Sequence, residues 1–126
     1  MLLDSNIIIY ASQPAHKPLR DFIAAHAPAV SAVSYVEVLG YHRLTQAERD
    51  AYSRFFAAAR VLPLDQPVLD SAVSLRRQRR MSLGDSLVAG TALVHRLTLV
   101  TRNTDDFRWV PGLQLLDPLA APPPAP

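Results

Sequence analysis

Short apolar runs alternate along this chain with longer segments of helical periodicity, and this alternation restricts the folds open to it. Each run is only a few residues long and bounded by polar residues, which indicates a buried strand. The runs lie at residues 1–4, 28–33, 60–65, 98–101 and 113–116. The segments between them predict helices over 5–13, 17–27, 34–44, 45–59, 65–80 and 84–97, and a turn or short helix over 103–110. The pattern predicts an α/β protein, a three-layer α/β/α sandwich with a central parallel sheet of four to five strands.

The length of 126 residues and the hydrophobic content of 49% fit one domain. We place it at residues 1–118, followed by a Pro/Ala-rich tail at 119–126 that is expected to be disordered. No apolar run reaches the roughly 18 residues of a membrane span, and the charge of Asp4 falls where a secretory signal needs apolar residues. We therefore expect a cytoplasmic protein. The chain has no cysteine, so any metal site must use oxygen or imidazole ligands.

Acidic residues stand where predicted strands lead into helices. Asp4 follows the first strand, and Glu37 lies just inside the helix after the second. Asp85 opens a helix that is apolar around most of its circumference, and Asp105 or Asp106 follows the fourth strand. In open parallel sheets, ligands bind beyond the carboxyl ends of the strands. These acids are therefore candidates for one shared site.

Helix capping is the alternative explanation of each acid taken singly. The capping positions would be Asp4 before Ser5, Ser34 before Glu37, Ser82 before Asp85, and Asn103 before Asp105 and Asp106. Helix caps need not lie near one another, whereas several carboxylates at one sheet edge repel and raise each other's pKa values. A hard divalent cation such as Mg²⁺ relieves that repulsion, lowers the pKa of a bound water and neutralises charge on a phosphodiester. The joint pattern favours metal-dependent phosphodiester chemistry.

Four segments in order resemble the motifs of the PIN domains, most closely the small VapC-type toxins of bacterial toxin–antitoxin pairs. They are MLLDSNIIIY, YVEVLGY, SLGDSLVAGTAL and LVTRNTDDF followed by VPGLQLLDP, and the resemblance spans residues 1–118. It implies the PIN-like sandwich and an endoribonuclease that depends on Mg²⁺ or Mn²⁺. It also implies a homodimer and a small VapB-like antitoxin as partner. Single-stranded or loop RNA is the expected substrate, because its bases and backbone are accessible.

The resemblance assigns roles to individual residues of this chain. It implies that the metal ligands, and so the catalytic residues, are Asp4, Glu37, Asp85 and Asp106. Ser5 is expected to orient a carboxylate or a metal-bound water, and Asn103 is expected to act as an orienting amide. The fourth position stays open between Asn103, Asp105 and Asp106; we favour Asp106, which precedes Phe107 as in the family's motif.

Arginines supply candidate contacts to RNA phosphates. Arg102 adjoins the fourth motif, whereas Arg76 and Arg77 begin a cluster that continues with Arg79 and Arg80. The alternative for the cluster is a solvated helix end whose cations complement the helix dipole. For the whole protein, two rivals to the nuclease remain: a non-catalytic PIN-like RNA-binding or regulatory module, and a phosphotransferase that forms a phosphoaspartate at Asp4.

Overall fold

The structure, a computed structural model, describes residues 1–120 and contains a five-stranded parallel sheet with the strand order β3-β2-β1-β4-β5. The strands in chain order are β1 (Leu2–Leu3), β2 (Ala29–Ser31), β3 (Val61–Leu62), β4 (Leu99–Val100) and β5 (Leu115–Leu116). Each strand lies inside one of the five predicted apolar runs. Of the predicted tail, residues 121–126 lie outside the described residues.

Residues 1–120 also contain seven α-helices and one 3₁₀ helix. They are α1 (Ser5–Ala11), η1 (Pro14–His16), α2 (Lys17–His26), α3 (Ala32–Leu39), α4 (Gln46–Ala58), α5 (Gln66–Gln78), α6 (Leu83–His95) and α7 (Thr104–Phe107). Within these described residues, no helix is long and apolar enough to span a membrane.

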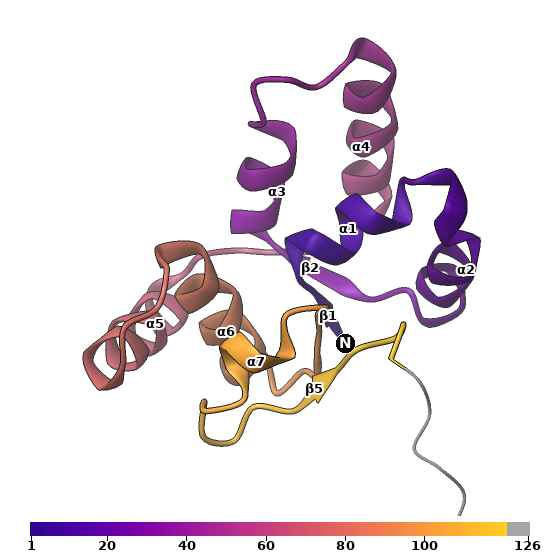
Figure 1. Cartoon of the computed structure of the whole chain (residues 1–126). Helices are drawn as coiled ribbons and strands as arrows, with labels where there is room; N and C mark the ends of the chain where they lie inside the picture. The colour runs from indigo at the N-terminus through magenta and orange to yellow at the C-terminus, as the bar shows by residue number, and fades with distance from the viewer. Residues whose placement is uncertain (121–126) are drawn as a thin grey trace, which may run out of the picture.

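The helices form two layers, one on each face of the sheet (Figure 1). Successive strand residues point to opposite faces. Leu2 therefore packs into a core with Val88 of α6 and Phe107 of α7, whereas its neighbour Leu3 packs into a second core with Ile7 of α1 and residues of α2, α3 and α4. Two separate cores confirm the predicted three-layer sandwich.

The helix after β2 differs from its prediction at both ends. It was expected over residues 34–44, but α3 begins at Ala32 because Ser31 Oγ accepts a hydrogen bond from the Val33 amide at 3.2 Å. It ends at Leu39, before Gly40, so the chain reaches α4 through a short non-helical segment. As a result Ser34 is a buried residue inside α3, and its predicted role as the cap before Glu37 is wrong.

Candidate acidic site

Asp4 lies between β1 and α1 as the N-cap residue of α1, and it is only 6% exposed. Its Oδ1 accepts a hydrogen bond from the Ser5 amide at 2.8 Å, which caps α1 as predicted, and its Oδ2 accepts one from the Thr101 hydroxyl at 2.8 Å. Burial raises the pKa of Asp4 to about 6; the hydrogen bonds from Thr101 and Ser5 oppose this shift, and the charges of Asp85 and Glu37 add to it. Asp4 is therefore both a helix cap and a buried carboxylate close to other acids.

Glu37 is joined to Asp4 through the intervening Ser5. The Ser5 hydroxyl donates a hydrogen bond to Glu37 Oε1 at 3.0 Å and lies 2.9 Å from the buried Ser34 Oγ. Glu37 itself projects from α3 with an exposed side chain. The Ser5 hydroxyl thus contacts a carboxylate, that of Glu37.

Asp85 lies in the first turn of α6, where its amide donates to Ser82 Oγ at 3.1 Å. The side chain is half-buried, and burial is the main cause of its raised pKa; a hydrogen bond with Ser82 opposes the shift, while the charges of Asp106 and Glu37 reinforce it. The preceding Gly84 lets α3 approach closely, because a Cβ at that position would lie 2.9 Å from Glu37 Oε2. The start of α6 and the acid of α3 are therefore in contact.

The two aspartates of α7 have different surroundings. Asp105 forms an exposed ion pair with Arg108 at 2.8 Å. Asp106 is exposed and close enough to Asp85 for its charge to raise that group's pKa. Asn103, just before α7, makes no side-chain cap hydrogen bond to the helix, so its predicted capping role is wrong. Of these three residues, Asp106 is the one whose charge raises the pKa of another acid, Asp85.

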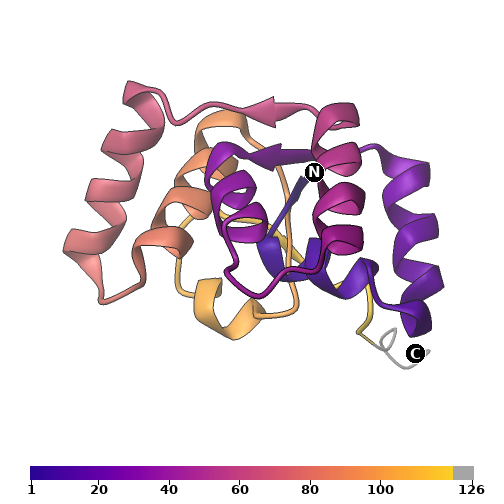
Figure 2. The same cartoon turned by 90° about the horizontal axis from the view of Figure 1, so that it is seen from above.

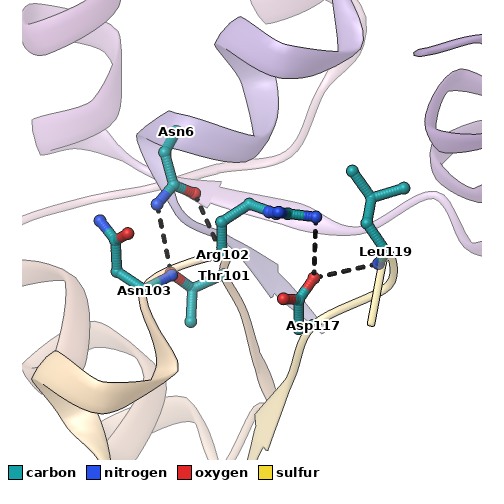
Figure 3. A network of polar contacts seen from close by, with 6 residues as sticks. All are labelled: Asn6, Thr101, Arg102, Asn103, Asp117 and Leu119. Carbon is teal, nitrogen blue, oxygen red and sulfur yellow. Dashed lines mark hydrogen bonds and ion pairs between the residues drawn. The ribbon is translucent and has the colours of Figure 1, made fainter. Parts of the chain in front are cut away.

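Thr101 and Asn6 were not identified from the sequence as site residues. Thr101 follows β4, is fully buried, and donates to Asp4 while accepting from the Asn103 amide at 3.0 Å and from Asn6 Nδ2 at 3.4 Å. Asn6 also accepts from the amide of Arg102 at 3.4 Å (Figure 3). These contacts tie the end of β4 to the start of α1. The only sequence signal was a hydroxyl residue ending the fourth apolar run.

Arg102, expected to contact phosphate, has partners within the protein. Its guanidinium lies 3.8 Å from Asp117 and 5.5 Å from the ring centroid of Tyr10. Asp117 also accepts a hydrogen bond from the Leu119 amide, and in Figure 3 the side chains of Arg102 and Asn103 extend in opposite directions. Contact with a phosphate would therefore compete with this internal ion pair.

At the carboxyl edge of the sheet, Asp4 follows β1 and caps α1, and Asp85 and Asp106 lie in the first turns of α6 and α7. Figure 2 shows the start of α6 and the short α7 on the same side of the molecule. Asp4, Glu37, Asp85 and Asp106 come from four separate elements, and each is coupled to at least one other by charge. Within residues 1–120, no three acid or imidazole side chains stand close enough to share one ion in this conformation.

The fold and this edge define a class of protein, an α/β sandwich with acids collected beyond the ends of its parallel strands. The chain belongs to the PIN domain family, whose model matches residues 1–113. It is similar to Ribonuclease VapC10 of Mycobacterium tuberculosis, with 35% identity over 137 aligned positions that cover 97% of this chain and 95% of that protein.

Solved structures of toxin–antitoxin proteins share the fold. A toxin–antitoxin complex from Klebsiella pneumoniae superposes with a TM-score of 0.75 at 26% identity, covering 93% of this chain and 96% of that one. DNA-bound VapBC from Salmonella typhimurium gives a TM-score of 0.82 at 20% identity over the same shares of the two chains. The predicted parallel α/β/α architecture is therefore confirmed by comparison as well.

Proposed function

We propose that this protein is a metal-dependent endoribonuclease, the toxin of a VapBC-type toxin–antitoxin pair, acting on single-stranded or loop RNA. The observation that carries the proposal is the set of four acids from four elements at one sheet edge, two of them with raised pKa values. The similarity to a ribonuclease along 97% of the chain supports the same conclusion. The proposed PIN-like domain comprises residues 1–118.

The chemistry of these residues fits Mg²⁺ or Mn²⁺. The donors are carboxylate oxygens, which hard divalent cations prefer, and a cation would relieve the repulsion that contributes to the raised pKa values of Asp4 and Asp85. The absence of a side chain at Gly84 leaves room for Glu37 against the start of α6. We propose Asp4, Glu37, Asp85 and Asp106 as the metal-binding, catalytic residues.

The protein's own groups position these ligands. Thr101 and the Ser5 amide each donate to one oxygen of Asp4, so the orientation of that carboxylate is fixed by two hydrogen bonds. The Ser5 hydroxyl similarly restrains Glu37. A bound divalent cation would supply a water of lowered pKa and would neutralise charge on the scissile phosphate. Asn103 and Asp105 remain less favoured candidates for the fourth position.

The proposed partners follow from the relatives. Several similar structures are complexes of a toxin with its antitoxin, and we propose a small VapB-like antitoxin for this chain. A homodimer is also predicted, to be tested by light scattering during size-exclusion chromatography. Co-expression with a VapB-like antitoxin that binds this chain should reverse any growth arrest that the toxin alone produces.

Cleavage of RNA by the purified protein tests the proposal. Wild type is expected to cut with Mg²⁺ or Mn²⁺ and not with chelator, leaving 5′-phosphate and 3′-hydroxyl ends, whereas Asp4→Asn/Asp85→Asn does not cut. Asp106→Asn is compared with Asp105→Asn, an adjacent change of equal charge at the residue paired with Arg108. Loss of cleavage only in Asp106→Asn supports the favoured ligand. Equal cutting by wild type and the double variant would reject the acidic site.

Metal binding measured beside RNA cleavage separates the nuclease from the non-catalytic rival. Titration calorimetry with Mn²⁺ is expected to detect binding to wild type and weaker or no binding to Asp4→Asn/Asp85→Asn. If Mn²⁺ binds through these acids but no RNA is cut under any condition tested, the non-catalytic RNA-binding module becomes the better account.

A further inference from the structure

The corner between α5 and α6 carries four arginines in five residues. Together with Val73, Gln78 and Met81, they line a surface cavity of about 640 Å³ that we call the arginine groove; the arginines are Arg76, Arg77, Arg79 and Arg80. All four have exposed side chains. No acidic residue lines the groove, and within residues 1–120 none of the four forms an ion pair with a carboxylate.

The groove is more than a solvated helix end, because two of its arginines are held in place. Arg76 Nε donates to the Met81 carbonyl at 3.3 Å, across the turn that joins the helices. The guanidinium of Arg79 lies 5.7 Å from the ring centroid of Trp109, a cation–π contact with a segment outside the corner. Arg77 and Arg80 have no side-chain hydrogen bond or ion pair within the described chain, so their charges are available to a ligand.

Trp109 connects the groove to the acidic site. Its indole Nε1 donates to the carbonyl of Asp106 at 3.1 Å, so the ring that Arg79 covers is attached to the turn carrying the proposed fourth ligand. On the other side, the groove ends at Met81, four residues before Asp85. Figure 2 shows the end of α5, the start of α6 and α7 on the same side of the molecule.

We propose that the arginine groove binds the phosphates of the RNA strand flanking the cleavage position, with a base able to stack beside Arg79 and Trp109. This inference rests on the proposed function for the identity of the ligand. A polyanion compensates the four clustered positive charges, and aromatic and guanidinium planes stack on unpaired bases. The acids repel phosphate in the absence of metal, so a separate cationic surface is needed to hold the strand beside them.

The test measures binding of a short fluorescein-labelled single-stranded RNA by anisotropy, in chelator so that it is not cut, over a range of salt concentrations. The groove variant is Arg77→Gln/Arg80→Gln, at two exposed side chains. The plot of log affinity against log salt has a negative slope, and each lost phosphate contact on a single strand makes that slope shallower by about 0.7. Losing two contacts should therefore make it shallower by about 1.4. Reckoned from equal affinities at 1 M salt, this slope difference makes the variant bind RNA roughly 25-fold more weakly than wild type at 0.1 M salt.

The matched control is Arg49→Gln/Arg54→Gln, which removes the same charge from exposed positions of α4. α4 contributes to the core on the opposite face of the sheet from α5 and α6. The control is expected to retain most of the wild-type affinity and slope. If the two double variants bind RNA equally, the groove has no specific role and the proposal is overturned.

Trp109 is the only tryptophan of the chain and contacts Arg79 of the groove, so its fluorescence reports on that end of the groove. RNA is expected to quench it in wild type and much less in the groove variant, whereas polyglutamate, which has charge but no bases, should not quench it. Equal quenching by polyglutamate would indicate an acidic protein segment as the ligand and overturn the RNA assignment. Because binding is measured without cleavage, loss of RNA binding in the groove variant supports the groove even if no nuclease activity is found. Conversely, if the groove variant binds RNA as tightly as wild type and wild type cleaves RNA, only the groove proposal is rejected.

Discussion

Replacing Asp4 by Asn is expected to stabilise the metal-free protein at neutral pH, although it removes a proposed metal ligand. Asp4 is 6% exposed, and burial raises its pKa from 3.8 to about 6 against the opposing hydrogen bonds of Thr101 and Ser5. A carboxyl group that binds its proton more tightly in the folded than in the unfolded chain destabilises the folded state at pH values above its unfolded pKa.

The size of the effect follows from that shift. A change of about 2 pKa units corresponds to roughly 3 kcal/mol. Between about pH 4 and pH 6 the folded wild type holds more protons than the unfolded chain, so its free energy of unfolding falls as the pH rises. Asn retains an oxygen for the Ser5 amide, while impaired hydrogen bonding to Thr101 costs about 1 kcal/mol. Asp4→Asn should therefore be less stable than wild type near pH 4 and about 2 kcal/mol more stable above pH 6.

Urea unfolding followed by circular dichroism from pH 4 to pH 8, with chelator present, measures this difference. Asp105→Asn serves as the control, because the Asp105 side chain is 86% exposed and its ion pair is at the surface. Parallel stability curves for wild type and Asp4→Asn across the whole range would refute the reasoning. Adding Mn²⁺ should then stabilise wild type more than Asp4→Asn, which reverses part of the difference at neutral pH.

Three further changes test other parts of the site. Thr101→Val removes the hydroxyl donor to Asp4 from a buried position and should weaken Mn²⁺ binding, measured by calorimetry, about 10- to 100-fold. Gly84→Ala places a Cβ 2.9 Å from Glu37 Oε2 and should lower the cleavage rate without lowering the melting temperature, because Glu37 is exposed and Ala favours a helix by about 1 kcal/mol over Gly. Phe107→Ala, at a side chain 1% exposed, should cost about 3–5 kcal/mol in urea unfolding.

Hydrophobic patterning was sufficient to predict the layers and all five strands, because each strand lies in a short apolar run and the three central strands are buried. It overestimated their lengths. The run at 28–33 contains a strand of only three residues, Ala29–Ser31, since Ser31 already caps the next helix. Apolar content does not distinguish the last residue of a buried strand from the first turn of a buried helix, and only the backbone hydrogen bonds locate that boundary.

The candidate acids could be chosen from the sequence because the chain order of strands and helices fixes which residues reach the carboxyl edge. Their hydroxyl partners could not. Thr101 lies 97 positions from Asp4, and Ser34 lies 29 positions from Ser5, so neither hydrogen bond has a local sequence pattern. The same applies to the Arg79 and Trp109 contact, which depends on how two separate loops approach each other.

Two aspartate caps in this one chain show why capping alone does not account for Asp4. Asp65 caps α5 by accepting a hydrogen bond from the Val68 amide at 3.3 Å, and its side chain is exposed, so water solvates the charge. Asp4 also caps its helix, but it accepts from the amide of the next residue, Ser5, and it is buried. Burial raises its pKa, and the charges of Asp85 and Glu37 add to the shift. A neutral Asn or Ser would cap α1 without that electrostatic cost. The burial and the neighbouring acids are what a cation site requires and a helix cap does not.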